Sequence, residues 1–138
     1  MGEPVERPAC QVRLLRELSI ADVGASVRVT GAVVRIGLEP GCALLAEPVG
    51  DGREARVQLW VNMSRAVGPT LVAAGGWQSA LREGGLIQVL GELERRQTPE
   101  DGLQLLLRAR VARIVDGLDM PLYEKCLQVC RGFAANHC

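Results

Sequence analysis

The sequence is poor in several residue types on which common functions depend. It contains one histidine, one tyrosine, one phenylalanine and two tryptophans, and its 16 basic residues are balanced by 16 acidic ones. A zero net charge argues against tight nucleic-acid binding by the chain alone, because neutralising phosphates supplies most non-specific affinity. So few aromatic side chains also leave little to stack on bases along a groove. We therefore expect any nucleic-acid contact of the isolated chain to be local and weak.

Signatures of catalysis and of membrane association are also missing. The single histidine, His137, is next to last in the sequence, and no serine or cysteine has an evident base. There is no Gly-x-x-x-x-Gly-Lys loop, and no run approaches the roughly 18 apolar residues of a membrane span. The first residues hold no apolar signal core, and Glu6 stands where a myristoylation pattern needs serine or threonine. We expect an intracellular protein that is not an enzyme, needs no cofactor and binds no membrane.

The cysteines form no C-x-x-C pair. They are Cys10, Cys42, Cys126, Cys130 and Cys138. An odd number without a secretory signal predicts reduced thiols. By count alone, Cys126, Cys130, His137 and Cys138 could supply a zinc site. These ligands would all come from the tail of one helix, so we expect no metal and interpret Cys126 and Cys130 as small buried hydrophobic residues.

Two short segments, 27–31 and 87–91, share one pattern. In each, branched aliphatic residues alternate with other residues, and a glycine follows on the aliphatic side. Alternation with a period of two buries one face of a strand. A glycine on that face marks a bend or bulge where a small barrel closes. Two such strands in one short chain predict an all-β fold, a closed five-stranded barrel of the OB type, which binds single-stranded nucleic acid or partner proteins.

Turn residues divide the chain into the elements of one such barrel. Strands are expected at residues 26–36, 42–46, 55–62, 86–94 and 103–114. Two helical segments divided by Gly75 and Gly76 are expected between the third and fourth strands, the clearer one at 77–83. A further helix is expected after Asp119. The predicted architecture is therefore an OB-fold, five-stranded Greek-key barrel with a C-terminal helix. Residues 1–12 would form a flexible lead-in, 13–117 the barrel, and 118–138 a partner-docking helix and tail.

Alternation assigns the faces of the strands. The residues of the third strand expected to face the core are Ala55, Val57, Leu59 and Val61. Those of the last strand are Leu105, Leu107, Ala109 and Val111. Trp60 then falls on the outer face. An apolar patch that precedes the first strand, and that we expect to cover the barrel, consists of Leu14, Leu15, Leu18 and Ile20.

The C-terminal helix carries an apolar stripe. Asp119 fits the N-cap and Pro121 the first turn. The residues that then recur at helical spacing are Leu122, Cys126, Val129, Cys130 and Phe133. From the residues alone, this stripe fits two structures: it docks on a partner, or it lies across the protein's own barrel.

Four arginines fall on outward positions of the predicted strands: Arg28, Arg56, Arg108 and Arg110. One interpretation is a single-strand groove, in which the arginines bind phosphates and the indole of Trp60 stacks on a base. The alternative is a solvated barrel face with cross-strand ion pairs to residues such as Glu92 and Glu94. For Trp60 itself, an anchor in a protein interface is the better interpretation, since tryptophan is enriched at such positions.

Three longer segments resemble a known family. Residues 24–31, 89–93 and 109–123 are similar to the Ten-one (Ten1) family, the smallest subunit of the CST telomere complex of Ctc-one (Ctc1), Stn-one (Stn1) and Ten1. The run 113–133 is most similar to plant and green-algal members. The resemblance covers residues 14–133, although the connection 66–85 is longer than in animal members, and no function is transferred to it.

The resemblance implies a set of partners. It implies that the barrel pairs with the N-terminal OB domain of Stn1 through the C-terminal helix and one barrel face. The partner-binding residues would be Leu122, Tyr123, Cys126, Leu127, Val129, Cys130, Phe133 and Trp60. It further implies that the heterodimer joins Ctc1 at telomeres in the nucleus, binds G-rich single strands, and helps DNA polymerase alpha–primase fill in the complementary strand. The alternatives are a small OB subunit of another genome-maintenance complex, replication protein A-like or RecQ-associated, and an autonomous single-stranded nucleic-acid binder.

Overall fold

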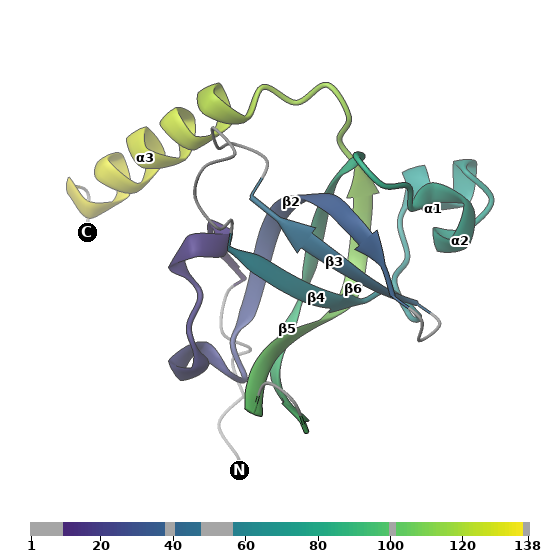
Figure 1. Cartoon of the computed structure of the whole chain (residues 1–138). Helices are drawn as coiled ribbons and strands as arrows, with labels where there is room; N and C mark the ends of the chain where they lie inside the picture. Colours follow the sequence, from purple (N-terminus) through teal and green to yellow (C-terminus); the bar gives the residue numbers. More distant parts are fainter. Residues whose placement is uncertain (1–9, 38–40, 48–56, 100–101, 137–138) are drawn as a thin grey trace, which may run out of the picture.

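A computed structural model shows strands that close into a barrel, with a helix at the C-terminal end (Figure 1). It describes residues 10–37, 41–47, 57–99 and 102–136, with the backbone alone for 134–136. The strands are β1 (Gln11–Val12), β2 (Ser26–Ile36), β3 (Cys42–Ala46), β4 (Gln58–Asn62), β5 (Leu86–Thr98) and β6 (Gly102–Ile114). The helices are the one-turn η1 (Leu15–Glu17) and η2 (Ile20–Asp22), then α1 (Pro69–Ala73), α2 (Trp77–Ala80) and α3 (Met120–Asn136).

Strand β2 closes the barrel. Its first part, from Ser26 to Ala32, pairs with β5, and its second part pairs with β3. The order β1-β2-β3-β4-β6-β5, completed by the β2–β5 pairing, gives a closed five-stranded barrel with the short β1 beside it. A Cβ atom at Gly31 would lie 3.0 Å from the Cβ of Leu45 and 3.2 Å from the carbonyl oxygen of Ala46. The predicted OB barrel, with a glycine where its long strand bends, is confirmed.

The core is made of inward-facing aliphatic side chains from all five barrel strands. Its largest fully buried side chains are Leu15, Leu45, Met63, Leu93, Leu107, Val27, Val29, Val33, Val61 and Val89. Leu14 is also buried and Leu18 packs against the core, whereas Ile20 is exposed. The apolar patch before β2 therefore covers the barrel through all but its last member, as a pair of one-turn helices.

The prediction that Val111 faces the core is wrong. Val111 is 44% exposed, and its neighbour Ala112 is buried instead. The cause is a β-bulge: Leu90 pairs with Val111 but Gly91 pairs with Ala109, which leaves Arg110 as an extra residue on β6. One extra residue reverses the alternation of every side chain that follows.

The limits of three elements also differ from the prediction. Strand β4 begins at Gln58, because the pairing with β3 ends there; Val57, expected inside, lies beyond that end and is exposed. Ala55 and Arg56 lie outside the described residues. Strand β5 runs on to Thr98 as a two-stranded ribbon with β6. The two helical segments expected between the third and fourth strands, divided by Gly75 and Gly76, are present as α1 and α2. The second, expected at 77–83, ends at Ala80.

The start of the described chain is ordered against the barrel. Gln11 and Val12, assigned to the flexible lead-in, pair in parallel with Val27 and Arg28 of β2, so the prediction is wrong for these two residues. Residues 1–9 lie outside the described part. Within the described part, no helix combines the length and the apolar character needed to cross a lipid bilayer.

Candidate functional site

Helix α3 begins as the sequence predicts. The side-chain Oδ1 of Asp119 accepts a hydrogen bond of 3.1 Å from the backbone N–H of Leu122, and Pro121 lies in the first turn. Met120 is buried and anchors this end of the helix. From there α3 extends on the side of the barrel away from α1 and α2 (Figure 1).

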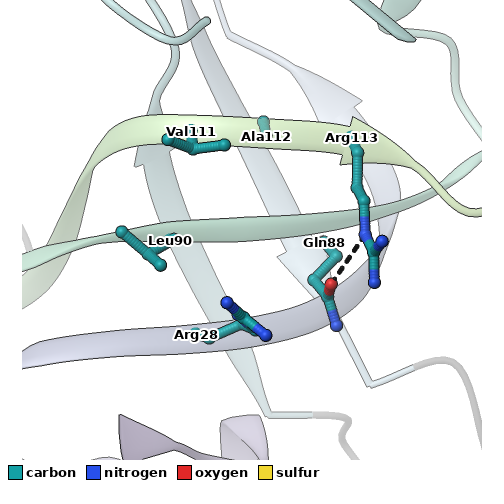
Figure 2. A pocket seen from close by; sticks show the side chains of 6 residues that line it. All are labelled: Arg28, Gln88, Leu90, Val111, Ala112 and Arg113. Carbon is teal, nitrogen blue, oxygen red and sulfur yellow. Dashed lines mark hydrogen bonds between the residues drawn. The ribbon is translucent and has the colours of Figure 1, made fainter. Parts of the chain in front are cut away.

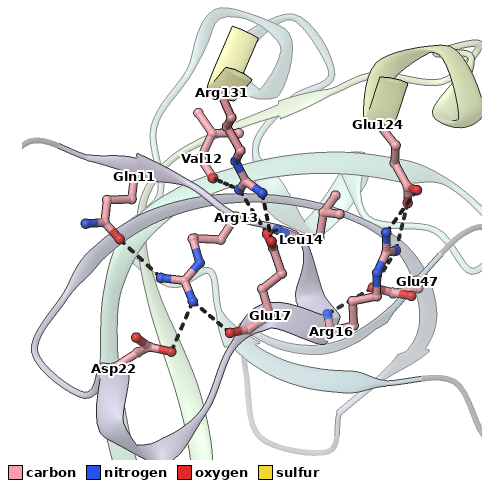
Figure 3. Close-up of polar contacts among 10 residues, drawn as sticks. All are labelled: Gln11, Val12, Arg13, Leu14, Arg16, Glu17, Asp22, Glu47, Glu124 and Arg131. Atoms are coloured by element: carbon pink, nitrogen blue, oxygen red, sulfur yellow. Dashed lines mark hydrogen bonds and ion pairs between the residues drawn. The ribbon is translucent and has the colours of Figure 1, made fainter. Parts of the chain in front are cut away.

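The side of α3 that faces the barrel is held by charge. The guanidinium of Arg131 donates to both carboxylate oxygens of Glu17, at 2.7 and 2.9 Å, and to the carbonyl oxygen of Val12 at 2.6 Å (Figure 3). We call this group the Arg131 clamp. A two-pronged arginine–carboxylate pair fixes orientation as well as distance. The clamp therefore ties the last turns of α3 to the segment before β2.

A second clamp lies two turns earlier in α3. Arg16 of η1 donates to both carboxylate oxygens of Glu124, at 3.0 and 3.2 Å. The backbone N–H of Arg16 also donates to the carboxylate of Glu47 at 2.9 Å. Arg16 therefore connects α3, the N-terminal segment and the end of β3. We call this group the Arg16 clamp. Two attachments along one helix fix its direction as well as its position.

The clamps perturb the groups that form them. The hydrogen bond from Arg131 lowers the pKa of Glu17 to about 2, and a 2.7 Å hydrogen bond from the backbone N–H of Leu14 acts in the same direction. The same pair raises the pKa of Arg131. The hydrogen bond to Glu124 raises the pKa of Arg16. Each ion is thus favoured by its partner in the folded chain.

The opposite side of α3 carries exposed apolar side chains. We call it the outer stripe; it consists of Leu122, Cys126, Val129, Cys130 and Phe133. Leu122, Val129 and Phe133 are 56%, 66% and 64% exposed, and both cysteines are exposed. The stripe does not lie across the protein's own barrel. Cys126 and Cys130, interpreted from the sequence as small buried residues, are exposed on this chain.

Two further predicted partner residues lie on the barrel side of α3. Leu127 lines a groove of about 520 Å³ between α3 and the N-terminal segment, and Cys130, at the edge of the outer stripe, borders the same groove. Tyr123 is half-buried, and its hydroxyl oxygen is buried without a hydrogen-bond partner among the described residues. Both side chains therefore lie on the side of α3 that faces the barrel, and not in the outer stripe.

Trp60 lies on the outer face of the barrel, as expected. It pairs with Leu44 of β3 and Leu106 of β6, and its side chain is half-buried. It borders a hollow of about 310 Å³ with Gln58 and Gln104. A half-covered indole at a hollow fits a fixed anchor better than a mobile stacking platform.

The structure describes three of the four arginines predicted to contact DNA, and their partners differ. Arg108 pairs with Glu94 at 3.1 Å and Arg110 with Glu92 at 2.7 Å, which are the cross-strand ion pairs of the alternative interpretation. Arg28 is exposed and makes no ion pair with any described residue. Arg56 lies outside the described part. Arg28 lies on the part of β2 that pairs with β5, whereas Trp60 lies on β4, which pairs with β3 and β6, so the two residues are not on neighbouring strands.

A polar hollow next to Arg108 was not identified from the sequence. It measures about 170 Å³ and is lined by Asn62, Ser64, Arg65 and Arg108. Asn62 pairs with Arg108 across β4 and β6, two positions along from Trp60. For metals, no group of three or more histidine, cysteine or acidic side chains comes together among the residues with described positions; His137 and Cys138 are not among these.

The clamps are the main functional feature that sequence reasoning missed. Arg131 and Glu17 are 114 positions apart, and Arg16 and Glu124 are 108 apart. Each residue taken alone is an ordinary charged side chain on a helix. No local spacing rule connects residues that far apart, so only the folded chain reveals them.

Comparison with known proteins identifies a family that matches nearly the whole chain. The family model described as "Telomere-capping, CST complex subunit" matches residues 7–137. No curated protein sequence matches.

Among solved structures, a chain of the S. pombe Stn1–Ten1 complex is similar with a TM-score of 0.61 and 12% identity, covering 94% of this chain and 98% of that one. S. pombe Ten1 by itself is similar with a TM-score of 0.60 and 13% identity, covering 90% of this chain and 99% of that one. An OBody bound to hen egg-white lysozyme has a TM-score of 0.54 and 13% identity, covering 78% of this chain and 97% of that one. At these identities the structures establish a shared fold.

Proposed function

Since the chain belongs to the Ten1 family of telomere-capping CST complex subunits, we propose that it pairs with Stn1 through the outer stripe of α3. The partner surface would be the N-terminal OB domain of Stn1. The subunit would act by binding, without catalysis, at telomeres in the nucleus.

The observation that carries this proposal is the orientation of α3. Three large apolar side chains, Leu122, Val129 and Phe133, are more than half exposed on one side of a helix. The two clamps hold the other side of that helix against the barrel. Covering such side chains contributes about 1.5–3 kcal/mol each when burial is complete. A helix fixed in this way is already oriented for a partner, which reduces the entropy lost on binding.

The family and the fold comparison support Stn1 as the occupant. One similar structure is a complex of Stn1 and Ten1, and its matching chain is covered over 98% of its length. Cys126 and Cys130, exposed in the isolated chain, would then become the small buried hydrophobic residues that their type suggests. Ctc1 would join the heterodimer through a surface other than the outer stripe.

We assign contact with telomeric single strands to the assembled complex. On this chain, the surface that fits best is the outer face of β4 and β6, where Arg65 and Arg108 border the polar hollow. Because Arg108 and Arg110 are ion-paired, they offer limited charge to phosphates, and the contribution of this chain would be modest. Support of polymerase alpha–primase fill-in would follow from holding the strand within the complex.

Co-expression with the N-terminal OB domain of Stn1 from the same source tests the pairing. Size-exclusion chromatography with light scattering should show a one-to-one complex. Phe133→Asp combined with Cys126→Asp places charge on the outer stripe and should abolish it. The matched control is Gln128→Asp, since Gln128 is exposed on α3 outside the stripe.

Two outcomes would contradict the proposal. Separate monomer peaks for the wild-type proteins would exclude Stn1 as the partner. A stable complex with the doubly substituted chain would show that α3 is not the interface. Circular dichroism of the variants establishes in either case that the barrel has folded.

A further inference from the structure

A second surface, on the outer face of β2, β5 and β6, has the features of a binding site. Arg28 pairs with Leu90, Leu90 pairs with Val111, and Val111 forms a parallel bridge with Val67. Residues paired across strands share a face of the sheet. These four side chains therefore form one row across the barrel wall, with the arginine at one end and three aliphatic residues beyond it.

The aliphatic part of this row is exposed because of the β-bulge. The extra residue Arg110 turns Val111 outward, beside Leu90. Val111 is 44% exposed and Val67 is 62% exposed, while Leu90 is half-buried. Bulges frequently re-aim a side chain at a functional site. Here the bulge places a branched aliphatic side chain on a face that strand alternation would have made polar.

The next row of the same face holds a second arginine. Arg113 donates through Nε to the side-chain oxygen of Gln88 at 2.8 Å (Figure 2). Gln88 in turn donates to the hydroxyl of Thr30 at 3.2 Å. Gln88 is 7% exposed, so this chain of hydrogen bonds is fixed within the wall. It orients the guanidinium of Arg113 and leaves its terminal nitrogens for a ligand.

The arginines of this surface differ in their pairing from Arg110, which lies in the adjoining row with Glu92 and Ser26. There, Arg110 is paired with Glu92 and also donates to Ser26 at 3.2 Å. Arg28 and Arg113 have no carboxylate partner within the described part of the chain. Together with Gln88, Leu90, Val111 and Ala112 they line a cavity of about 220 Å³, shown in Figure 2. We call it the Arg28–Arg113 pocket.

We infer that the Arg28–Arg113 pocket binds an extended, acidic segment of a partner protein. The two arginines lie two strands apart and two residues apart in register, which places their Cα atoms about 12 Å from each other. In an extended peptide, residues i and i+4 span about 13 Å, and residue i+2 points to the same side. The segment therefore has the form acid–x–aliphatic–x–acid, with its carboxylates on the arginines and its central side chain on Val111 and Leu90.

The lining of the pocket favours peptide over nucleic acid. It contains no aromatic side chain on which a base would stack. Its floor is aliphatic, and arginine forks match the geometry of carboxylates. This surface does not involve α3, so the inference does not depend on pairing through the outer stripe.

Titration of the full chain with two synthetic peptides tests the inference. The first is acetyl-Ser-Asp-Ser-Leu-Ser-Asp-Ser-amide, carrying a fluorophore. The second, acetyl-Ser-Asp-Leu-Ser-Ser-Asp-Ser-amide, has the same composition, but its leucine points to the other side. The first should bind at least about tenfold more tightly, because only its leucine reaches the floor while both carboxylates are held.

Substitutions identify the site of binding. Arg28→Gln should weaken binding of the first peptide about tenfold, and this variant removes no contact within the described chain. Arg113→Gln should do the same. Arg95→Gln, at an exposed arginine on the β5–β6 ribbon, should leave binding unchanged, as should Phe133→Asp.

Three outcomes would overturn the inference. The first is that the two peptides bind with equal affinity. The second is that Arg95→Gln and Arg28→Gln weaken binding of the first peptide equally. The third is that a short oligo(dT) strand displaces this peptide at comparable concentration. The last would assign the pocket to nucleic acid.

Discussion

In the barrel, the side chains of Leu45, Val61 and Leu107 are fully buried in one core, whereas the long helix α3 is attached mainly through two charged clamps and the buried Met120. Apolar packing is not directional and tolerates little loss of volume. Ion pairs at a partly exposed site contribute little net stability but fix geometry. The barrel therefore provides the stability of the chain, and the clamps determine where the outer stripe is presented.

The largest expected effect comes from the barrel core. Leu107→Ala removes a fully buried side chain and leaves a cavity, and should lower the free energy of unfolding by about 3 kcal/mol. Leu103→Ala, on the same strand at a 54% exposed position, should cost less than about 1 kcal/mol. Urea denaturation followed by tryptophan fluorescence measures both. Equal effects would mean that the barrel is not the stabilising unit.

A second test compares a glycine at the β-bulge with a glycine in α3. A Cβ atom at Gly91 would overlap the carbonyl oxygen of Arg108, so Gly91→Ala should lower the free energy of unfolding by about 2 kcal/mol. At Gly132 of α3 an added Cβ meets nothing within 4 Å. Gly132→Ala should therefore stabilise the helix by up to about 1 kcal/mol. The comparison is wrong if the two substitutions shift the same denaturation midpoint in the same direction.

The clamps should affect position more than stability. Arg131→Gln should lower the global free energy of unfolding by less than about 1 kcal/mol, because its side chain and that of Glu17 are 39% and 30% exposed. Amide hydrogen exchange in α3 should nevertheless accelerate, by up to roughly tenfold, as the helix detaches locally. Glu17→Gln should act on the same interaction, so the double variant should be no worse than either single one. Additive effects would show that the two residues act separately.

The smallest effect is a dependence on pH. The pKa of Glu17 is about 2 in the folded chain against 4.5 for the free side chain, so its pair contributes fully above pH 4.5. That contribution is lost as the pH falls from 4.5 through 2. Exchange of α3 amides should accelerate in this range relative to barrel amides, and the acceleration should be absent in Glu17→Gln. Release of α3 only above pH 5 would contradict the assignment.

The barrel could be predicted from the sequence because its signals are local. Strands β2 and β3 have the limits that alternation and turn residues indicate, and the glycine at position 31 marks the bend. The orientation of Val111 could not be predicted, because the bulge arises where β6 meets Gly91 on another strand. The outer stripe was found by its helical spacing, but its exposure depends on clamps whose members are more than a hundred positions apart.

The clamps also set the order in which contacts can form during synthesis. Arg16 and Glu17 precede strands β2 to β6, and Arg131 follows them. Domains fold from the N-terminus as synthesis proceeds, so the barrel strands can pair before α3 exists. The Arg131 clamp can close only after β6 and most of α3 have been made. The barrel therefore forms first, and the outer stripe is fixed in place afterwards.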